Sequence, residues 1–269
     1  MKQLLMVAAL GALMLCPSAA RAQTSLAKPV TPSAPSPGFF TNYTFHMDAA
    51  SLSGGDDTAE AFDWDANFGG DLDLIDYGAG RLNFLANYQV VLGNQLRVFD
   101  PNQGNYTLEF SSSLRVGRTE FAGVFHHISR HLSDRPKAFA IAWNEAALRV
   151  SRPLDAGRWH ATLQADLGRM TERAFVDYVW QAEGDATARY DINAHVAAVF
   201  AGSVTTIGTD AAVAGRGRLT GGRGEAGVLL SGTRGALELF AAVDRRIDAD
   251  PIDRQIRTFG LLGFKLLSK

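Results

Sequence analysis

Apolar and polar side chains alternate along most of this chain with a period of two residues. In the segment 105–116, for example, Tyr106 and Leu108 alternate with Thr107 and Glu109. This spacing places successive side chains on opposite faces of a strand, so it predicts β-strands with one apolar and one polar face. We find no convincing helical spacing after residue 38. We therefore predict an all-β fold of about twelve strands, in the segments 42–49, 62–74, 81–92, 105–116, 119–128, 137–151, 158–167, 175–187, 192–202, 220–230, 236–244 and 256–267.

The way these strands are connected favours a membrane barrel over a soluble one. A soluble barrel would turn its apolar face inward, whereas an outer-membrane barrel turns it toward lipid. The strands reach the roughly 9–11 residues that a tilted membrane strand needs, and their polar face is densely charged. The connections also alternate between short (77–80, 116–118, 231–235) and long (93–104, 130–136, 203–217, 245–255), with 170–174 as a short exception. We predict a transmembrane antiparallel up-and-down β-barrel, with the long connections on the outer side.

The N-terminus predicts export. Lys2 precedes an apolar run at 4–15 that is too short to span a bilayer, and Ala20-Arg21-Ala22 forms a small-residue cleavage site. We expect a signal peptide at 1–22, a flexible leader rich in proline and serine at 23–37, and the barrel at 38–269. The protein is thus expected in the cell outer membrane, with the barrel-assembly machinery as its partner during insertion.

The composition of the chain argues against several classes of function. The chain has one cysteine, Cys16, which lies in the expected signal peptide, so disulfides and cysteine nucleophiles are excluded from the mature protein. The formal net charge of −2 gives no basic footprint for nucleic acid. Motifs for phosphate-binding loops, metalloproteases and nucleophile elbows are absent from the sequence.

The segment 119–137 carries the candidate chemistry. Its alternation places Phe121 and Phe125 on the lipid-facing side, and the same parity places His127 and Ser129 there, near the outer end of the strand. His126 then faces the lumen. A histidine and a serine on one face are the residue types of a general base and a nucleophile.

The motif His127-Ile128-Ser129 resembles the His-x-Ser of the outer-membrane lipid A 3-O-deacylases. The resemblance implies a lipid ester hydrolase in which Ser129 attacks, His127 deprotonates it, and a glutamate on the following strand orients the histidine. On that strand the glutamate is Glu145, which a hairpin centred near residue 133 would pair with position 121, too far away to reach. We therefore name Asp134 as the third member. The segment also resembles uncharacterised Gram-negative barrels with a His/Ser-rich loop, which imply no activity.

The same segment carries a group of basic side chains. Phosphates of lipopolysaccharide are natural partners for such a group at the outer rim. The first functional interpretation is therefore a barrel of unresolved role that contacts outer-membrane lipid and lipopolysaccharide; the second is the hydrolase, and the third is a narrow channel for small solutes or ions. The residues expected to bind lipid phosphate are Arg130, His131, Arg135 and Lys137.

Alternating carboxylates on the lumen face allow one further interpretation. Such a set could hold a hard cation such as Ca²⁺, or it could form a polar network with lumen arginines, since unpaired buried charge is costly. No calcium-loop spacing is present, so we favour the network and expect no metal or other cofactor. The carboxylates are Asp63, Asp65, Asp71 and Asp73, and the expected arginine partners are Arg81, Arg115, Arg158 and Arg257.

Overall fold

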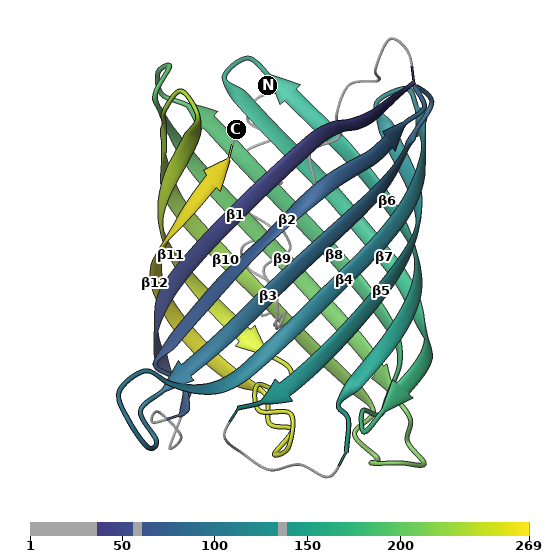
Figure 1. Cartoon of the computed structure of the whole chain (residues 1–269), viewed down its shortest axis with the longest axis vertical. Coiled ribbons are helices and arrows are strands. Elements are labelled where there is room, and N and C mark those ends of the chain that lie inside the picture. Colours follow the sequence, from purple (N-terminus) through teal and green to yellow (C-terminus); the bar gives the residue numbers. More distant parts are fainter. Residues whose placement is uncertain (1–36, 56–60, 134–138, 269) are drawn as a thin grey trace, which may run out of the picture.

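The chain folds into a closed antiparallel barrel of twelve strands (Figure 1). The computed structural model describes residues 37–55, 61–133 and 139–268. The expected signal peptide, and the expected leader except Pro37, lie outside the described residues. Each strand pairs with its sequence neighbours and β1 pairs with β12, so the predicted fold class is confirmed. The strands are β1 Gly38–Gly54, β2 Trp64–Asp76, β3 Arg81–Gly93, β4 Asp100–Val116, β5 Thr119–Leu132, β6 Ala142–Ala156, β7 Trp159–Ala174, β8 Tyr178–Asp191, β9 Val196–Thr209, β10 Arg218–Ser231, β11 Gly235–Arg246 and β12 Arg257–Ser268.

The two ends of the barrel differ in their connections. The chain enters β1 and leaves β12 at one end, called here the inner end, and the tight turns lie there as well (Figure 1). The opposite, outer end carries longer connections, including 94–99, 210–217 and 247–256. Several strands run further toward the outer end than the sequence predicts, because alternation continues through residues that resemble loop. Most outer connections are correspondingly shorter than expected, but the one between β5 and β6 spans 133–141 rather than 130–136.

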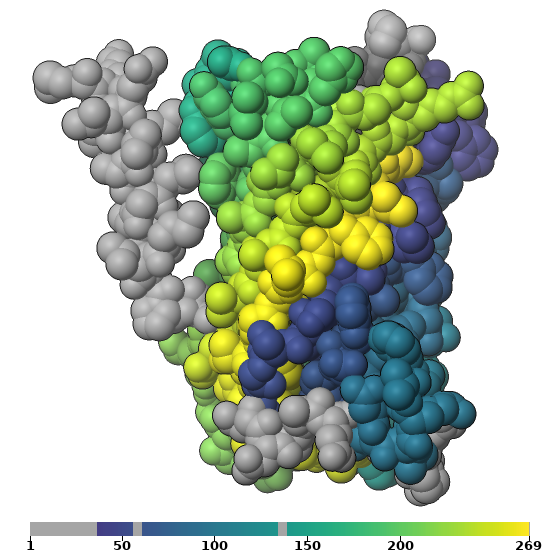
Figure 2. Space-filling model, turned by 90° about the vertical axis from the view of Figure 1, so that its left-hand side faces the viewer, coloured from purple at the N-terminus to yellow at the C-terminus, as the bar shows by residue number. Residues whose placement is uncertain are grey.

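The seam between the first and last strands closes the sheet. His46 to Gly54 pair with Leu267 to Phe259 along this seam. Figure 2 shows β12 lying directly against β1 on the outer surface. Closure gives the backbone N–H and C=O groups of both edge strands hydrogen-bond partners. A sheet in hydrocarbon requires this, because lipid chains offer no such partners. Among the described residues, no helix is long and apolar enough to span a membrane.

The apolar face looks outward, as predicted. On β4, Tyr106 and Phe110 are 45 % and 48 % exposed, whereas Asn105 and Glu109 are 1 % and 4 % exposed and point into the barrel. The interior is therefore polar, and the outer surface is an apolar band suited to lipid.

Ion pairs fill the interior. Arg149 binds Glu109 at 2.6 Å and Asp166 at 2.8 Å, and Lys265 binds Glu225 and Glu238 from the opposite wall. Since a buried charge is tolerated when it is paired and hydrogen-bonded, this network explains how so many charged residues fit in a narrow lumen.

Two clusters of buried apolar side chains lie near the outer end of the interior. One includes Phe62 and Phe259, whose ring centroids are 5.3 Å apart. The other includes Trp143, Tyr178 and Ile207. Some lumen positions near this end are therefore apolar, against the simple rule of an apolar outside and a polar inside.

Candidate active site

The register between β5 and β6 determines which side chains meet near the candidate motif. His127 lies opposite Asn144, and Ser129 lies opposite Ala142. The expected pairing of Glu145 with Phe121 is wrong, because β5 continues to Leu132 and β6 begins only at Ala142. The turn between them thus lies later in the chain than a hairpin centred near residue 133. Glu145 instead pairs with His126.

Three polar side chains form a chain of hydrogen bonds on the outward face. Nδ1 of His127 lies 2.7 Å from Oδ1 of Asn144, and Nδ2 of Asn144 lies 2.8 Å from Oε2 of Glu172 on β7. A carboxylate only accepts hydrogen bonds, so the Asn144 amide must donate to Glu172 and turn its oxygen toward the histidine. His127 then donates from Nδ1, which leaves the lone pair on Nε2. This is the tautomer of a general base at Nε2.

Ser129 lies beside this chain. It is two residues after His127 on the same face of β5, a spacing of about 7 Å along the strand. Its hydroxyl is 3.0 Å from Nε2 of His131, the next outward residue. The ring of His131 in turn contacts Tyr106 edge-on, with centroids 5.2 Å apart. The serine thus lies between two imidazoles at the outer end of β5, and the predicted placement of His127 and Ser129 on one outward face is confirmed.

A β-bulge in β7 brings Glu172 to this face. Glu145 pairs with Met170, but its neighbour Asn144 pairs with Glu172, so Thr171 is an extra residue in the ladder. The hydroxyl of Thr171 lies 3.4 Å from the backbone oxygen of Asn144. A bulge reverses the alternation that follows it, and here it turns Glu172 outward. Neither Asn144 nor Glu172 was predicted from the sequence, although Asn144 has the parity of its outward neighbour Leu148.

Glu145 belongs to a different group, on the lumen side. Its carboxylate is 3.5 Å from Nδ1 of His126, whose Nε2 is 2.6 Å from Glu109. Arg149 joins the same group through Glu109. Glu145 therefore does not orient His127, and the reason is the face on which it lies rather than its distance along the strand. Asp134, the substitute named from sequence, lies outside the described residues.

The expected basic patch is only partly present on the surface. Arg130 is 4 % exposed and points inward, where its guanidinium donates to the backbone oxygens of Asp248 and Ala249 at 2.6 and 3.0 Å and to Gln103 at 2.8 Å. The prediction that Arg130 binds lipid phosphate is wrong, because β5 extends past it and alternation turns it into the barrel. His131 faces outward; Arg135 and Lys137 lie outside the described residues.

The carboxylates considered for a calcium site accept hydrogen bonds from neighbouring side chains. Asp65 pairs with Arg246 and accepts from Gln89 at 2.9 Å, and Asp73 accepts from Arg81 at 3.3 Å. Asp63 accepts a hydrogen bond from Asn94 and lies outside the lumen network. No group of three or more potential ligands among the described residues is arranged to hold a metal ion. Asp71 and Asp73 both accept a hydrogen bond from Nδ2 of Asn83, at 2.9 Å each.

Two of the four expected arginine partners are correct. Arg81 binds Asp73 and Glu120, and Arg115 binds Asp76 at 3.0 Å, inside the barrel. The other two are wrong: Arg158 donates to a turn carbonyl at the inner end, and Arg257 pairs with Asp253 in the last outer connection. The sequence analysis did not predict the lumen-facing basic residues that pair with carboxylates on nearby strands, namely Arg149, Arg223, Arg246 and Lys265.

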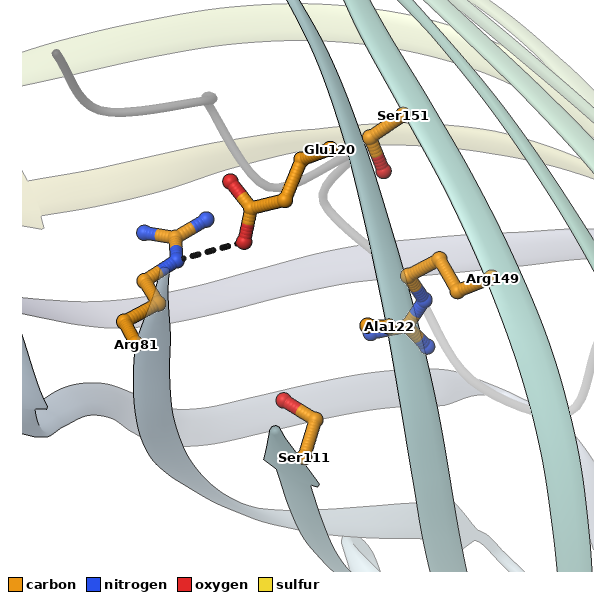
Figure 3. Close-up of a pocket in the computed structure, with 6 residues that line it drawn as sticks. All are labelled: Arg81, Ser111, Glu120, Ala122, Arg149 and Ser151. Carbon is orange, nitrogen blue, oxygen red and sulfur yellow. Dashed lines mark hydrogen bonds and ion pairs between the residues drawn. The ribbon is translucent and has the colours of Figure 1, made fainter. Parts of the chain in front are cut away.

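A small hollow lies inside the barrel between β3 and β6. Figure 3 shows Arg81 and Glu120 meeting across it and Arg149 pointing in from β6. The hydrogen bond from Arg81 to Glu120 is 2.9 Å long. The serines lining it, Ser111 and Ser151, are small and buried. Its charged groups are engaged with one another or with neighbouring residues, so it is part of the lumen network rather than a second candidate for catalysis.

Comparison with known proteins places the fold. No family model and no curated protein sequence matches the chain. Outer membrane phospholipase A from Escherichia coli is similar in structure, with a TM-score of 0.53 at 13 % identity, covering 84 % of this chain and 92 % of that one. A variant of that phospholipase with an active-site asparagine replaced by alanine gives 0.53 at 15 % identity, covering 89 % and 94 %.

A second kind of neighbour shows that the likeness is one of fold alone. An outer-membrane channel from Pseudomonas putida F1 has the same TM-score of 0.53, at 11 % identity, covering 90 % of this chain and 98 % of that one. An enzyme and a channel thus resemble this chain equally, and fold does not decide between such functions. With its closed barrel of twelve strands and apolar outer surface, the chain has the fold of the outer-membrane β-barrel proteins.

Proposed function

We propose that this protein is a serine hydrolase that cleaves acyl esters of lipids at the outer end of the barrel. The observation that carries the proposal is the hydrogen bond between His127 Nδ1 and Asn144 Oδ1, on the lipid-facing side, beside Ser129. Ser129 is assigned as the nucleophile, His127 as the general base, and Asn144 as the residue that orients the base.

The arrangement supports a two-step acyl transfer. The Ser129 oxygen attacks the ester carbonyl while its proton passes to Nε2 of His127, and that proton then goes to the departing alcohol. Water next attacks the acyl-serine, His127 accepts its proton, and the fatty acid leaves with Ser129 restored. Throughout, Asn144 accepts a hydrogen bond from Nδ1, which keeps the ring oriented in both its neutral and its protonated form.

His131 is assigned a different part from His127. The Ser129 hydroxyl rests on His131 in the structure, and attack requires it to turn about its Cα–Cβ bond toward His127. His127 is favoured as the base because Asn144 fixes its tautomer. His131 is proposed to hold the hydroxyl between turnovers.

The position of the site supports a lipid substrate. The outward neighbours of Ser129 and His127 on β4 are Tyr106 and Leu108, which are large and exposed. An acyl chain could lie along this surface while its ester group reaches the serine. The structural likeness to a phospholipase, of which an asparagine variant is described as an active-site mutant, also supports the proposal. The substrate class is an acyl ester, carried by phospholipid or by lipid A.

The test is release of fatty acid by the purified full chain, folded in detergent. One set of reactions contains phosphatidylethanolamine in mixed micelles and another contains lipopolysaccharide, and released acids are identified by mass spectrometry. We expect release from one substrate, abolished in Ser129→Ala and His127→Ala and retained in His131→Ala. No release from either substrate, or equal release by Ser129→Ala, would overturn the proposal. If His131→Ala abolished fatty-acid release and His127→Ala retained it, the general base would be His131 instead of His127.

Contact with lipopolysaccharide at the outer rim remains a prediction. Arg130, one of the basic residues on which that prediction rested, is buried inside the barrel. For the hydrolase, lipopolysaccharide is one of two alternative ester substrates. The parallel reactions with phosphatidylethanolamine and lipopolysaccharide show which of the two is cleaved.

A further inference from the structure

Glu172 has no role in the nucleophile–base pair, yet it is the end of the hydrogen-bond chain that leads to it. Its carboxylate oxygen lies 2.8 Å from the amide nitrogen of Asn144, whose oxygen lies 2.7 Å from His127. We infer that Glu172 is a positioning residue, which fixes the amide orientation of Asn144 and thereby the tautomer of His127. Its effect on turnover rests on the proposed function, whereas its effect on the tautomer does not.

The amide of Asn144 can face His127 in two orientations. The side chain of asparagine has an oxygen and a nitrogen in nearly equivalent places, so without a further partner it can face His127 with either. If the amide oxygen faces His127, then the histidine must donate from Nδ1 and keep its lone pair on Nε2. If the amide nitrogen faces His127, then the histidine must accept at Nδ1 and carry its proton on Nε2. That nitrogen cannot then take the serine proton. A carboxylate behind the amide selects the first orientation.

The backbone is arranged to place that carboxylate. A regular ladder after the pair Glu145–Met170 would set Thr171 opposite Asn144 and turn Glu172 into the barrel toward Trp143. The bulge at Thr171 reverses this and brings Glu172 to the outward face. Bulges are common next to active sites, where they redirect a side chain.

Removing the carboxylate tests the inference through the rate. We expect Glu172→Ala to lower kcat about tenfold with KM unchanged, the loss appropriate to one charge-assisted hydrogen bond. Glu172→Gln should restore most of the rate, because its side-chain oxygen can accept the same bond. Asp155→Ala is the matched control, since it removes an exposed carboxylate at the inner end, where Asp155 pairs with Arg118.

A double substitution separates positioning from a general effect on the fold. If Glu172 acts through Asn144, then Glu172→Ala should cause no further loss in a protein that already carries Asn144→Ala. In a protein that hydrolyses lipid, equal rates for wild type and Glu172→Ala, or a full additional loss in the Asn144→Ala background, would overturn the inference.

A second readout needs no substrate. Nitrogen-15 spectra of histidine-labelled protein in detergent micelles distinguish the two tautomers, and His127→Gln identifies the His127 signals by their loss. We expect Glu172→Ala to shift population from the Nδ1–H toward the Nε2–H form, and Asp155→Ala to leave it unchanged. A wild type that hydrolyses no lipid but shows this shift would overturn the proposed function and uphold the inference. An unshifted tautomer in Glu172→Ala would overturn the inference.

Discussion

His127 on β5 and Asn144 on β6 are direct cross-strand partners, and their side chains meet on the lipid-facing surface at 2.7 Å. One residue along each strand, His126 and Glu145 are also partners, but they face the lumen. Two histidines adjacent in sequence therefore belong to different environments. The proposed chemistry belongs to the outer one, and the inner one is part of the ion-pair network that fills the barrel.

Substitution of Asn144 should reduce hydrolysis without unfolding the barrel. Asn144→Ala removes the acceptor for His127 Nδ1–H, so both tautomers become populated and the ring loses its orientation. We expect kcat to fall about 100-fold, within the range that a general base contributes. Fatty-acid release under saturating substrate measures this. Glu145→Gln is the control on the opposite face of the same strand; a comparable fall in that variant would place the chemistry in the lumen.

Substitution of Arg130 should affect stability rather than lipid contact. Arg130→Ala leaves the carbonyl of Asp248 without its buried donor and removes one of the two donors to the carbonyl of Ala249, where Gln103 remains. This should lower the free energy of unfolding by about 2 kcal/mol. Urea unfolding in detergent measures the change, with Arg218→Ala as an exposed control on β10. Unchanged stability together with weaker binding to lipopolysaccharide would restore the surface role expected from the sequence.

The outer end should lose stability in acid through Asp177. Burial acts to raise the pKa of this carboxyl, but the hydrogen bonds and charge of Arg216, at 2.5 and 3.0 Å, outweigh it and hold the pKa below its ordinary value. A lowered folded-state pKa gives stability that is present above the unfolded pKa of about 4 and is lost as the pH falls through the folded value.

We therefore expect the unfolding free energy to fall between neutral pH and about pH 3, and to fall less in Arg216→Ala, where the pKa of Asp177 is no longer held down. Unfolding by urea at the two pH values measures both slopes. An equal fall in the variant and the wild type would show that this pair does not contribute to the acid sensitivity.

The lumen should not conduct ions. Arg149 and Lys265 each bridge two carboxylates inside the lumen, on two opposite sides of the barrel wall. Phe62, Phe259 and Trp143 pack near the outer end of the interior. We expect no current steps in a planar bilayer that contains the purified protein, under conditions in which a general porin gives clear ones. Regular steps from the folded protein would revive the channel interpretation.

The fold could be predicted from sequence because the barrel obeys a local rule. A side chain's parity along a strand sets its face, and residues such as Tyr106 and Phe110 reveal that parity without knowledge of their neighbours. The same rule placed His127 and Ser129 correctly. It failed at Trp143, which is apolar but faces the lumen, because near the outer end the interior holds apolar clusters of its own.

The rest of the site depends on properties that alternation does not carry. Which residue of β6 meets His127 is set by the turn between the strands, and the position of that turn shifted the register away from the expected one. Glu172 requires a bulge, and nothing in the alternation of β7 marks Thr171 as the extra residue. The sequence thus predicted the two residues on one strand and missed the partners contributed by the next two.

The central claim is that Ser129 is an activated nucleophile facing lipid, and covalent labelling tests it most directly. The folded protein would be treated with a long-chain alkyl fluorophosphonate, digested, and the modified residue located by mass spectrometry. We predict a single adduct on Ser129, formed much more slowly in His127→Ala and Asn144→Ala. No adduct on Ser129, or one formed at the same rate when His127 is replaced, would contradict this account.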